Sequence, residues 1–596
     1  GQEKEITTAG LAKMNLVLHN KATGEINTFS DPHYKDDKDD SVLRRFDFAV
    51  VNPPFSLKNW TDGVKDYGRF TGYGDMPPEK NGDYAWLLHI LKSLKSTGKA
   101  AVILPHGVLF RGNTEATIRQ HIIDKGYIKG IIGLPANLFY GTGIPACIIV
   151  IDKSDADNRQ GIFMIDASHD YIKDGNKNRL RERDIYKIVT TFNEQITTDP
   201  KYARFVPNEE IKIKNAYNLN IPRYIDSSEP EDLQDLEAHL HGGIPTADVD
   251  SMEKYWTHFP NLKKKLFSPL RDGYYKLNID KNDVRSTVYA DEEFSVYAEQ
   301  IDAAFDSWRQ EVDAGLRTIG DSVESKKYII ELSELLISKF ENIALVDKYD
   351  VYQVLLSYWQ ETMADDVFIL VQDGYEAGRE TEDVYEVTED KKTKKEKRKY
   401  KGWDGKLIPK SLIEAQYFAA ERAKIDEAQA VVDETQSKLD EMVEGQTAED
   451  GVLFDCLNDN NAVDAKKVND RIKELKKSAP DSEEYRIFCE YTKLCDKVKQ
   501  YAKIAKELNI ALDEACKEKY PLLSMDEIKE LLVNRKWYYT IFAGIKALYI
   551  TTSHEIAGRI TELAERYENT LPELESELET YEAKVKTHLE RMGFVW

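Results

Sequence analysis

The first 155 residues alternate short apolar runs with amphipathic stretches. Four runs have the length of a strand, at residues 46–51, 100–104, 128–134 and 146–151. Two stretches between them, at 85–94 and around 118–123, place Leu and Ile on one helical face. Gly98 follows the first stretch where a C-terminal capping glycine would end a helix. Strands that are apolar on both faces and separated by helices indicate an α/β sheet with helices on both sides.

The pattern loosens after residue 160 and becomes mostly helical after residue 229. From about residue 410, apolar side chains recur at heptad spacing in three segments, 425–442, 491–501 and 571–592. An intramolecular helical hairpin and a coil that binds a partner both fit these stripes. We expect an α/β domain over 1–228, a mixed, mostly helical region over 229–405, and a helical, coiled-coil-like domain over 406–596.

Composition limits the class of protein. The chain has 596 residues, 82 Lys and Arg, and 106 Asp and Glu, so its formal net charge is −24. That charge argues against a free-standing, nonspecific DNA coat, although a subunit with a local basic groove or a basic partner fits it. Five cysteines without CxxC spacing indicate neither a disulfide scaffold nor a metal site. Without a transmembrane-length apolar run or signal-peptide character at its start, the chain is expected to be cytoplasmic.

A basic run stands out in this acidic chain. Residues 391–401 (KKTKKEKRKYK) hold eight basic residues and one acid. A solvated loop between helices is the favoured interpretation, and contact with phosphate stays open.

The most informative position is Asn52-Pro53-Pro54-Phe55, which directly follows the apolar run 46–51. The two prolines fix two φ angles and remove two N–H donors beyond a strand end, which is where open α/β sheets bind ligands. A stiff loop remains, with the Asn52 side-chain oxygen and the Pro53 carbonyl as acceptors and Phe55 as an aromatic plate. A proline-rich turn that merely ends a strand is the structural alternative.

Two acceptors beside an aromatic ring suit the exocyclic amino group of a nucleobase. Hydrogen bonds accepted from both N–H groups favour a pyramidal nitrogen and localise its lone pair, which can then attack an electrophilic methyl group in line. Positioning and fixed dipoles supply this catalysis without a metal or a strong base. A base in a duplex must be flipped out to reach such a loop.

At these residues the chain resembles the amino-methyltransferases of DNA, and more narrowly the modification (methyltransferase) subunits of type I restriction–modification systems. The narrower resemblance rests on several stretches: residues 1–3, 11–19, 83–110, 118–151 and 217–224, and GRITELAERYENTLPELE and AKVKTHLERMGF near the end. It implies an S-adenosylmethionine-dependent methyltransferase-like doubly wound sheet, followed by a large helical region for subunit assembly.

The resemblance also implies roles for single residues. Asn52 and Pro53 would hold the amino group of the target adenine, with Pro54 stiffening the loop and Phe55 stacking on the base. Phe139 would stack on the opposite face, although a core position fits it equally well. For the cofactor S-adenosylmethionine, Glu3 would accept from the ribose hydroxyls. Asp31 matches the acidic position after the third strand, and a solvated acidic loop explains it equally well.

One motif of the family is missing. Its glycine-rich cofactor loop should precede Glu3, and the Gly-x-Gly fragments at 72–74 and 141–143 both follow Asn52–Phe55. The sheet is therefore expected to be incomplete at its N-terminus. Because residue 1 is Gly, we expect an N-terminally truncated protein whose fragment binds S-adenosylmethionine weakly and is inactive alone.

Three hypotheses follow for function. The first is methylation of adenine N6 in DNA, with a specificity subunit, a restriction subunit and a second modification subunit as the partners that the resemblance implies. The second is methylation of cytosine N4, where Ser more often replaces Asn52. The third is a catalytically inactive scaffold, motivated by the missing glycine loop.

Overall fold

The computed structural model describes residues 1–3, 5–28, 42–197, 199–228, 232–389, 396–447, 451–458 and 462–594. The chain divides into two compact units. The first contains residues 1–245, 271–274 and 566–596, and the second contains residues 246–270 and 275–565.

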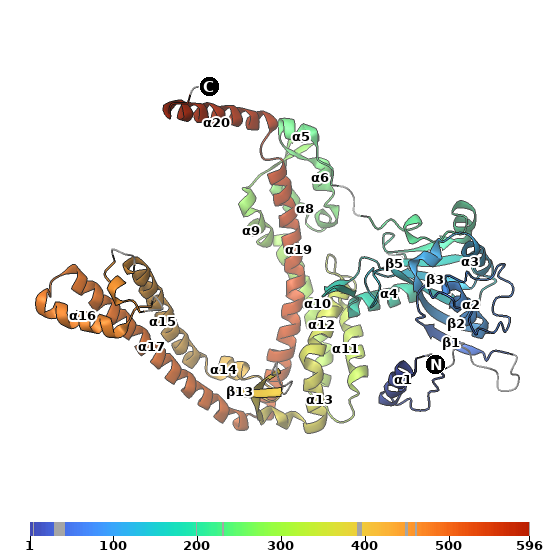
Figure 1. The fold of residues 1–596 in the computed structure, drawn as a ribbon, viewed down its shortest axis with the longest axis horizontal. Coiled ribbons are helices and arrows are strands. Elements are labelled where there is room, and N and C mark those ends of the chain that lie inside the picture. Colours follow the sequence, from blue (N-terminus) through green and yellow to red (C-terminus); the bar gives the residue numbers. More distant parts are fainter. Residues whose placement is uncertain are drawn as a thin grey trace. The chain divides into compact units, whose positions relative to one another are not determined.

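The first unit is built around a six-stranded mixed sheet (Figure 1). Its strands, in spatial order, are β1 (Phe46–Val51), β2 (Leu94–Pro105), β4 (Ala146–Asp152), β3 (Ile128–Gly133), β5 (Gly161–Asp166) and β8 (Ala203–Pro207). β1 pairs with β2 in parallel, as β3 does with β5, whereas β4 runs antiparallel between β2 and β3. Strands β1, β2, β3 and β5 therefore share one direction, and their carboxyl ends meet at one edge of the sheet.

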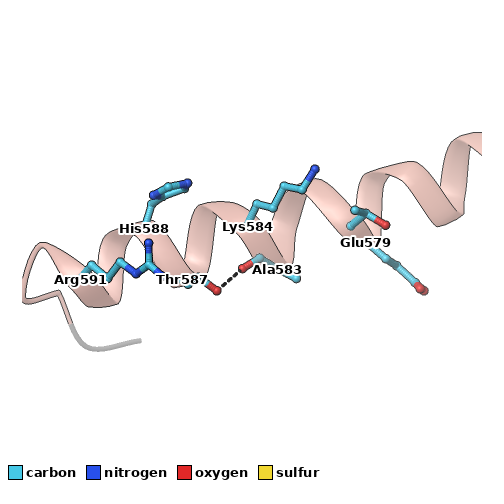
Figure 2. Close-up of a pocket in the computed structure, with 7 residues that line it drawn as sticks. Glu579, Ala583, Lys584, Thr587, His588 and Arg591 are labelled. Carbon is cyan, nitrogen blue, oxygen red and sulfur yellow. Dashed lines mark hydrogen bonds between the residues drawn. The ribbon is translucent and has the colours of Figure 1, made fainter.

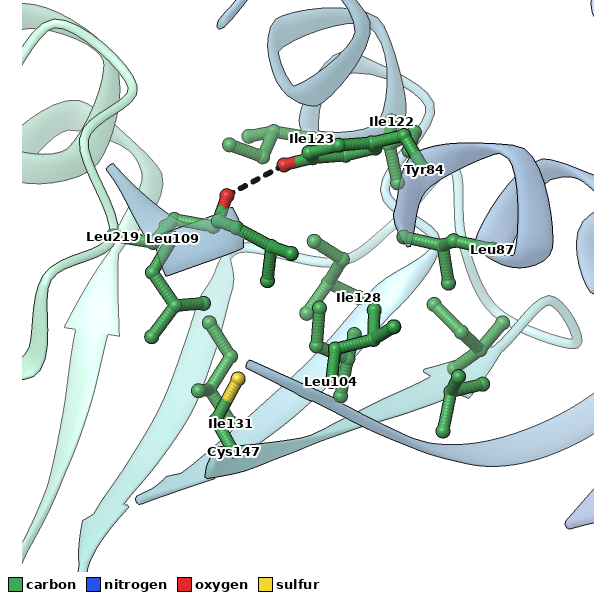
Figure 3. Close-up of a cluster of buried hydrophobic side chains, with 14 of the residues drawn as sticks. Tyr84, Leu87, Leu104, Leu109, Ile122, Ile123, Ile128, Ile131, Cys147 and Leu219 are labelled. Carbon is green, nitrogen blue, oxygen red and sulfur yellow. Dashed lines mark hydrogen bonds between the residues drawn. The ribbon is translucent and has the colours of Figure 1, made fainter. Parts of the chain in front are cut away.

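Helices cover both faces of this sheet. α2 (Asp83–Ser93) and α3 (Thr114–Asp124) share a buried cluster with Leu104 and Ile131, drawn in Figure 3. α4 (Glu182–Glu194) shares the other cluster with Ile132 and Ile165. Since successive side chains of a strand point to opposite faces, Ile131 and Ile132 enter different cores. This alternation explains why the strands are apolar throughout, and it confirms the expected α/β sheet.

The four predicted strands are confirmed, but the role predicted for Gly98 is wrong. α2 ends at Ser93, and Gly98 lies inside β2. The pairing register passes from Phe46↔Leu94 to Phe48↔Lys99, so β2 carries extra residues at this point. A Cβ on Gly98 would approach the Leu94 side chain at 2.9 Å, so this glycine permits a close approach within the irregular strand.

The other elements of the first unit are short or peripheral. They are α1 (Ile6–Leu18), η1 (His106–Leu109), the β6–β7 hairpin (Ile172–Asp174 and Lys177–Arg179), η2 (Glu210–Lys214), η3 (Ile221–Arg223), α5 (Leu236–His241), β9 (Ile244–Pro245) and α20 (Leu571–Arg591).

The second unit is mainly helical. Its helices are α6 (Thr246–Asp250), α7 (Glu253–Trp256), α8 (Pro260–Leu266), η4 (Lys281–Asp283), α9 (Val284–Tyr289), α10 (Glu292–Leu316), α11 (Ser325–Phe340), α12 (Lys348–Tyr358), η5 (Trp359–Met363), α13 (Ala364–Asp373), η6 (Tyr375–Arg379), α14 (Lys410–Tyr417), α15 (Ala419–Gln446), η7 (Phe454–Cys456), α16 (Ala465–Ser478), α17 (Glu483–Lys519), η8 (Tyr520–Leu522), α18 (Met525–Lys529), η9 (Glu530–Tyr538) and α19 (Tyr539–Arg566). Strands β10 (Phe267–Arg271) and β11 (Tyr274–Leu277) fall where the chain passes between the units, and β12 (Thr381–Glu389) pairs with β13 (Glu396–Gly405).

Two of the predicted heptad stripes, those of α15 and α20, differ in how far they are buried. α15 and α17 lie along each other (Figure 1), and the stripe of α15 buries Ile425, Ala428 and Leu439. The stripe of α20 is exposed, because that helix has no buried residue among those that the structure describes. The first stripe therefore serves an intramolecular hairpin, and the last one remains available to a partner.

The described half of the basic run is a strand. Residues 391–395 lie outside the described residues, whereas 396–401 belong to β13, so the loop interpretation is wrong for that part. β13 pairs antiparallel with the acidic β12, and Lys401 forms an ion pair with Glu386 at 2.8 Å. Part of the positive charge is therefore matched within the hairpin.

No helix in the described ranges combines the length and the apolar character that crossing a membrane requires. All five cysteines carry free thiols. Within the same ranges, no group of three His, Cys, Asp or Glu side chains could hold a metal ion.

Candidate active site at the sheet edge

The Asn52–Phe55 loop begins where β1 ends, at the edge shared by the carboxyl ends of the parallel strands. Asn52 and Pro54 are exposed, Pro53 is buried and Phe55 is half-buried. The loop thus presents the Asn52 amide to solvent while Pro53 and Phe55 hold it against the protein.

The two predicted acceptors are uncommitted. In the part of the chain that the structure describes, no hydrogen bond engages the Asn52 side-chain oxygen or the Pro53 carbonyl. Both oxygens therefore keep their capacity to accept from a bound amino group.

A buried ionic network anchors the loop immediately after Phe55. The Ser56 backbone N–H donates to Asp83 Oδ1 at 2.7 Å, and Asp83 is fully buried at the start of α2. Arg111 donates to Asp83 Oδ2 at 2.8 Å and lies 3.3 Å from Glu115. Ser56 has φ of +51°, a left-handed conformation that costs a non-glycine residue about 1 kcal/mol. The bond to Asp83 holds this turn in place.

The same network shifts two pKa values. Burial works to lower the pKa of Arg111, but hydrogen bonds and charge attraction from Asp83 and Glu115 hold it above its usual value. Burial raises the pKa of Glu115, although Arg111 opposes that effect. Sequence reasoning missed Asp83, Arg111 and Glu115, because their role depends on a contact between α2 and the loop that no local motif reveals.

Phe55 and Phe139 lie together. Their ring centroids are 5.6 Å apart, with an interplanar angle of 77°, so one ring meets the other edge to face. Both pack on the cluster that contains Ile132 and Leu134. A base sandwiched between the two rings would require one of them to turn, whereas a base stacked on one ring would meet the edge of the other.

The β6–β7 hairpin fixes the loop that carries Phe139. Lys177 Nζ donates to the carbonyls of Phe139 at 2.7 Å and Thr142 at 3.2 Å. Asn178 Nδ2 donates to the Ala136 carbonyl at 2.7 Å. This hairpin could not be predicted from the chain, since strands of three mostly polar residues have no recognisable pattern.

The structure describes one of the two residues expected at the cofactor, Glu3. Glu3 accepts through Oε1 from the Glu5 backbone N–H at 3.0 Å, and its own N–H donates to the Asn27 carbonyl. Asp31 lies outside the described residues. One oxygen of Glu3 is therefore engaged at the start of α1, and the role of Glu3 and Asp31 toward S-adenosylmethionine stays a prediction.

A surface recess also lies away from this edge of the sheet. Figure 2 shows it along α20, lined only by residues of that helix, including Lys584, His588 and Arg591. A single helix cannot enclose a reacting base, so this recess is no alternative active site.

Comparison with known proteins finds similarity to DNA methylases in the N-terminal part of the chain. Residues 1–233 match the family described as N-6 DNA Methylase. The type I restriction enzyme MpnII methylase subunit of Mycoplasma pneumoniae is 31% identical over 254 residues, which are 40% of this chain and 46% of that protein. The MjaVII methylase subunit of Methanocaldococcus jannaschii is 33% identical over 253 residues, 40% of this chain and 42% of that protein.

Among solved structures, the methyltransferase subunit of a type I restriction–modification system from Streptococcus thermophilus is 36% identical. The match covers 38% of this chain and 48% of that one, with a TM-score of 0.33. The matched part of the chain thus spans about half, or less, of the length of these relatives. The similarity to these proteins therefore rests on sequence identity and not on the structural superposition.

Proposed function

We propose that this chain, whose residues 1–233 match the family described as N-6 DNA Methylase, methylates the N6 amino group of adenine in DNA. The observation that carries the proposal is the pair of uncommitted oxygens on Asn52 and Pro53 at the carboxyl edge of the sheet.

The described residues would supply the half of the site that holds the base. An adenine flipped out of the duplex would donate one amino N–H to the Asn52 side chain and the other to the Pro53 carbonyl. Stacking on Phe55, with Phe139 at the rim, would fix the plane of the ring. S-adenosylmethionine, when bound, supplies the methyl group.

The loop acts through preorganisation. Pro53 and Pro54 restrict the backbone, and Asp83 holds the turn at Ser56 through a fully buried carboxylate. The acceptors therefore need little reorganisation when the amine becomes more positive during transfer, which is where fixed dipoles lower a barrier most.

The proposed assembly contains DNA, a specificity subunit, a restriction subunit and a second modification subunit. The exposed stripe of α20 supports docking of the specificity subunit, because its apolar side chains recur at coiled-coil spacing with no cover among the described residues. Its members are Leu571, Leu574, Leu578, Tyr581, Val585 and Met592. The charge of −24 is a further reason to expect that another subunit contributes to DNA binding.

Mass analysis of nucleosides tests the reaction. DNA incubated with the assembled complex and labelled S-adenosylmethionine should contain N6-methyldeoxyadenosine. N4-methyldeoxycytidine as the labelled product would replace the proposal with its cytosine alternative. If DNA incubated with the fully assembled complex contains no methylated nucleoside, that result would support the scaffold hypothesis.

A further inference from the structure

A second cavity lies at the same edge of the sheet, and none of residues 52–55 lines it. Its volume is about 310 Å³. His106 follows β2, Gly133 ends β3 and Asp166 ends β5. Part of the lining therefore lies at the carboxyl ends of three parallel strands. This volume is at the lower end of what small-molecule sites enclose.

Two buried polar atoms of the lining have no partner among the described residues. Asn178 is 5% exposed, and its Nδ2 is held by the Ala136 carbonyl, whereas its Oδ1 accepts no hydrogen bond. His106 Nε2 is likewise buried and unpaired. Buried side-chain polar atoms are mostly paired in folded proteins, so two unpaired ones in one cavity suit the binding of a polar group there.

A buried carboxylate faces the same space. Asp166 is 8% exposed, and it accepts from the Ser227 hydroxyl at 2.8 Å and the Ser168 N–H at 3.1 Å. Two carboxylate oxygens accept more bonds than these two, so Asp166 keeps acceptor capacity. Burial lowers the pKa of His106, although Asp166 opposes that effect, so this imidazole is neutral near pH 7 and offers a single N–H or a single lone pair.

Apart from Ser168 and His169, the remaining lining is apolar or aromatic. Leu134, Pro145 and Ile221 form walls, and Tyr171 is half-buried among them. The occupant must therefore combine N–H donors for Asn178 and Asp166 with a body that tolerates apolar contact. A carboxylate or phosphate would meet Asp166 unfavourably, and a purely apolar ligand would leave both acceptors unsatisfied.

We propose that this cavity binds a second, non-reacting nucleobase that carries an exocyclic amino group. The amino group donates to Asn178 Oδ1 and Asp166, His106 Nε2 meets a ring nitrogen, and the faces of the base lie against the apolar walls. The base belongs either to DNA or to a free nucleoside. Only the assignment to DNA rests on the proposed function.

Calorimetric titration of the full chain with adenosine and with purine riboside tests the proposal, since these nucleosides differ only in the amino group. Adenosine should bind on the order of tenfold more tightly. Asn178→Leu should abolish that preference, whereas Asn208→Leu should retain it. Asn208 is a matched control because its Nδ2 also donates to a backbone carbonyl, that of Arg159 at 2.7 Å, outside the cavity.

Two further variants keep the test decisive. His106→Phe retains a flat ring and should weaken adenosine on the order of tenfold, with circular dichroism confirming the fold. In the Asn52→Ala chain, which lacks the side-chain acceptor of the reacting site, a preference for adenosine should remain, and adding Asn178→Leu should abolish it. Loss of the preference in Asn52→Ala, with retention in Asn178→Leu, would place the ligand at the reacting site and overturn the proposal.

A single-stranded oligodeoxyadenylate in place of adenosine separates the two sources. Binding of the strand alone, weakened by Asn178→Leu and His106→Phe, would assign a base of DNA to the cavity. Binding of adenosine itself would assign a free nucleoside. If neither probe binds, or if both bind the cavity variants as they bind the unmodified chain, the cavity holds water only and the proposal is wrong.

Discussion

At the scale of the residue, a carboxylate that touches no substrate decides the geometry of the proposed site. Asp83 connects the start of α2 to the turn after Phe55 and is itself bonded to Arg111. Asn52 and Pro53 can remain uncommitted because the loop takes its fixed geometry from Ser56 and the prolines. The acceptors are thus separated from the groups that position them.

Asp83→Ala should lower the free energy of unfolding of the first unit by roughly 3 kcal/mol, since it removes the fully buried partner of Arg111 and the acceptor of the Ser56 N–H. Denaturant titration followed by tryptophan fluorescence measures this loss. Asp62→Ala, at an exposed carboxylate near the same loop, should change stability by less than about 0.5 kcal/mol. Equal effects of the two substitutions would show that the network does not anchor the loop.

At the scale of the element, hydrophobic periodicity was sufficient for β1, β3, β4 and the helices beside them. It was insufficient where packing overrides local signals. Gly98 has the sequence position of a helix cap, yet the irregular pairing of β1 with β2 places it inside a strand. The β6–β7 hairpin and the Asp83 network depend on contacts between residues far apart in sequence, which a single sequence cannot reveal.

Of the candidate site, too, one part could be predicted from the sequence and another part could not. The NPPF motif of residues 52–55 and its position after a strand could be predicted from the chain, because prolines and a preceding apolar run leave a local signature. The meeting of Phe55 with Phe139 depended on a resemblance to known proteins. The second cavity left no signature, since its two unpaired atoms belong to two separate elements, η1 and β7.

Helix α18 gives an element-scale prediction about pH. Glu527 accepts from the Ser524 N–H and from the hydroxyls of Ser524 and Tyr417, each at 2.8 Å, and these bonds lower its pKa to about 2. A lowered pKa stabilises the fold above the ordinary value of 4.5, and this contribution is lost as pH falls from there towards 2. Glu527→Gln should therefore flatten the fall of Tm over that window. The exposed control Glu518→Gln should leave it unchanged, and an identical acid transition in both variants would contradict the assignment.

At the scale of the whole molecule, the chain combines a small α/β unit with long helices and a strongly negative charge. One heptad stripe is used within the second unit, where α15 packs on α17, while the stripe of α20 is exposed. Such a division supports the proposal that the α/β unit acts inside a larger assembly. An isolated helix with an apolar stripe gains stability when a second helix covers that stripe.

Leu578→Asp should abolish co-purification with the specificity subunit, because it places a charge in the centre of the exposed stripe, where Leu578 is 59% exposed. Ala583→Asp introduces the same charge on the opposite side of α20 and should retain the complex. Size-exclusion chromatography of the co-expressed subunits measures both. Retention of the complex by Leu578→Asp would locate the docking surface elsewhere.

Methyl transfer by an Asn52→Ala variant in the assembled complex tests the central claim most directly. Loss of one acceptor should lower the rate of transfer on the order of 10²-fold or more, while S-adenosylmethionine affinity stays within a factor of about two. Asn158→Ala, at an exposed loop asparagine, should match the unmodified complex. Unchanged transfer by Asn52→Ala, or a loss of cofactor binding that accounts for all of its effect, would contradict a role for these oxygens in holding the amine.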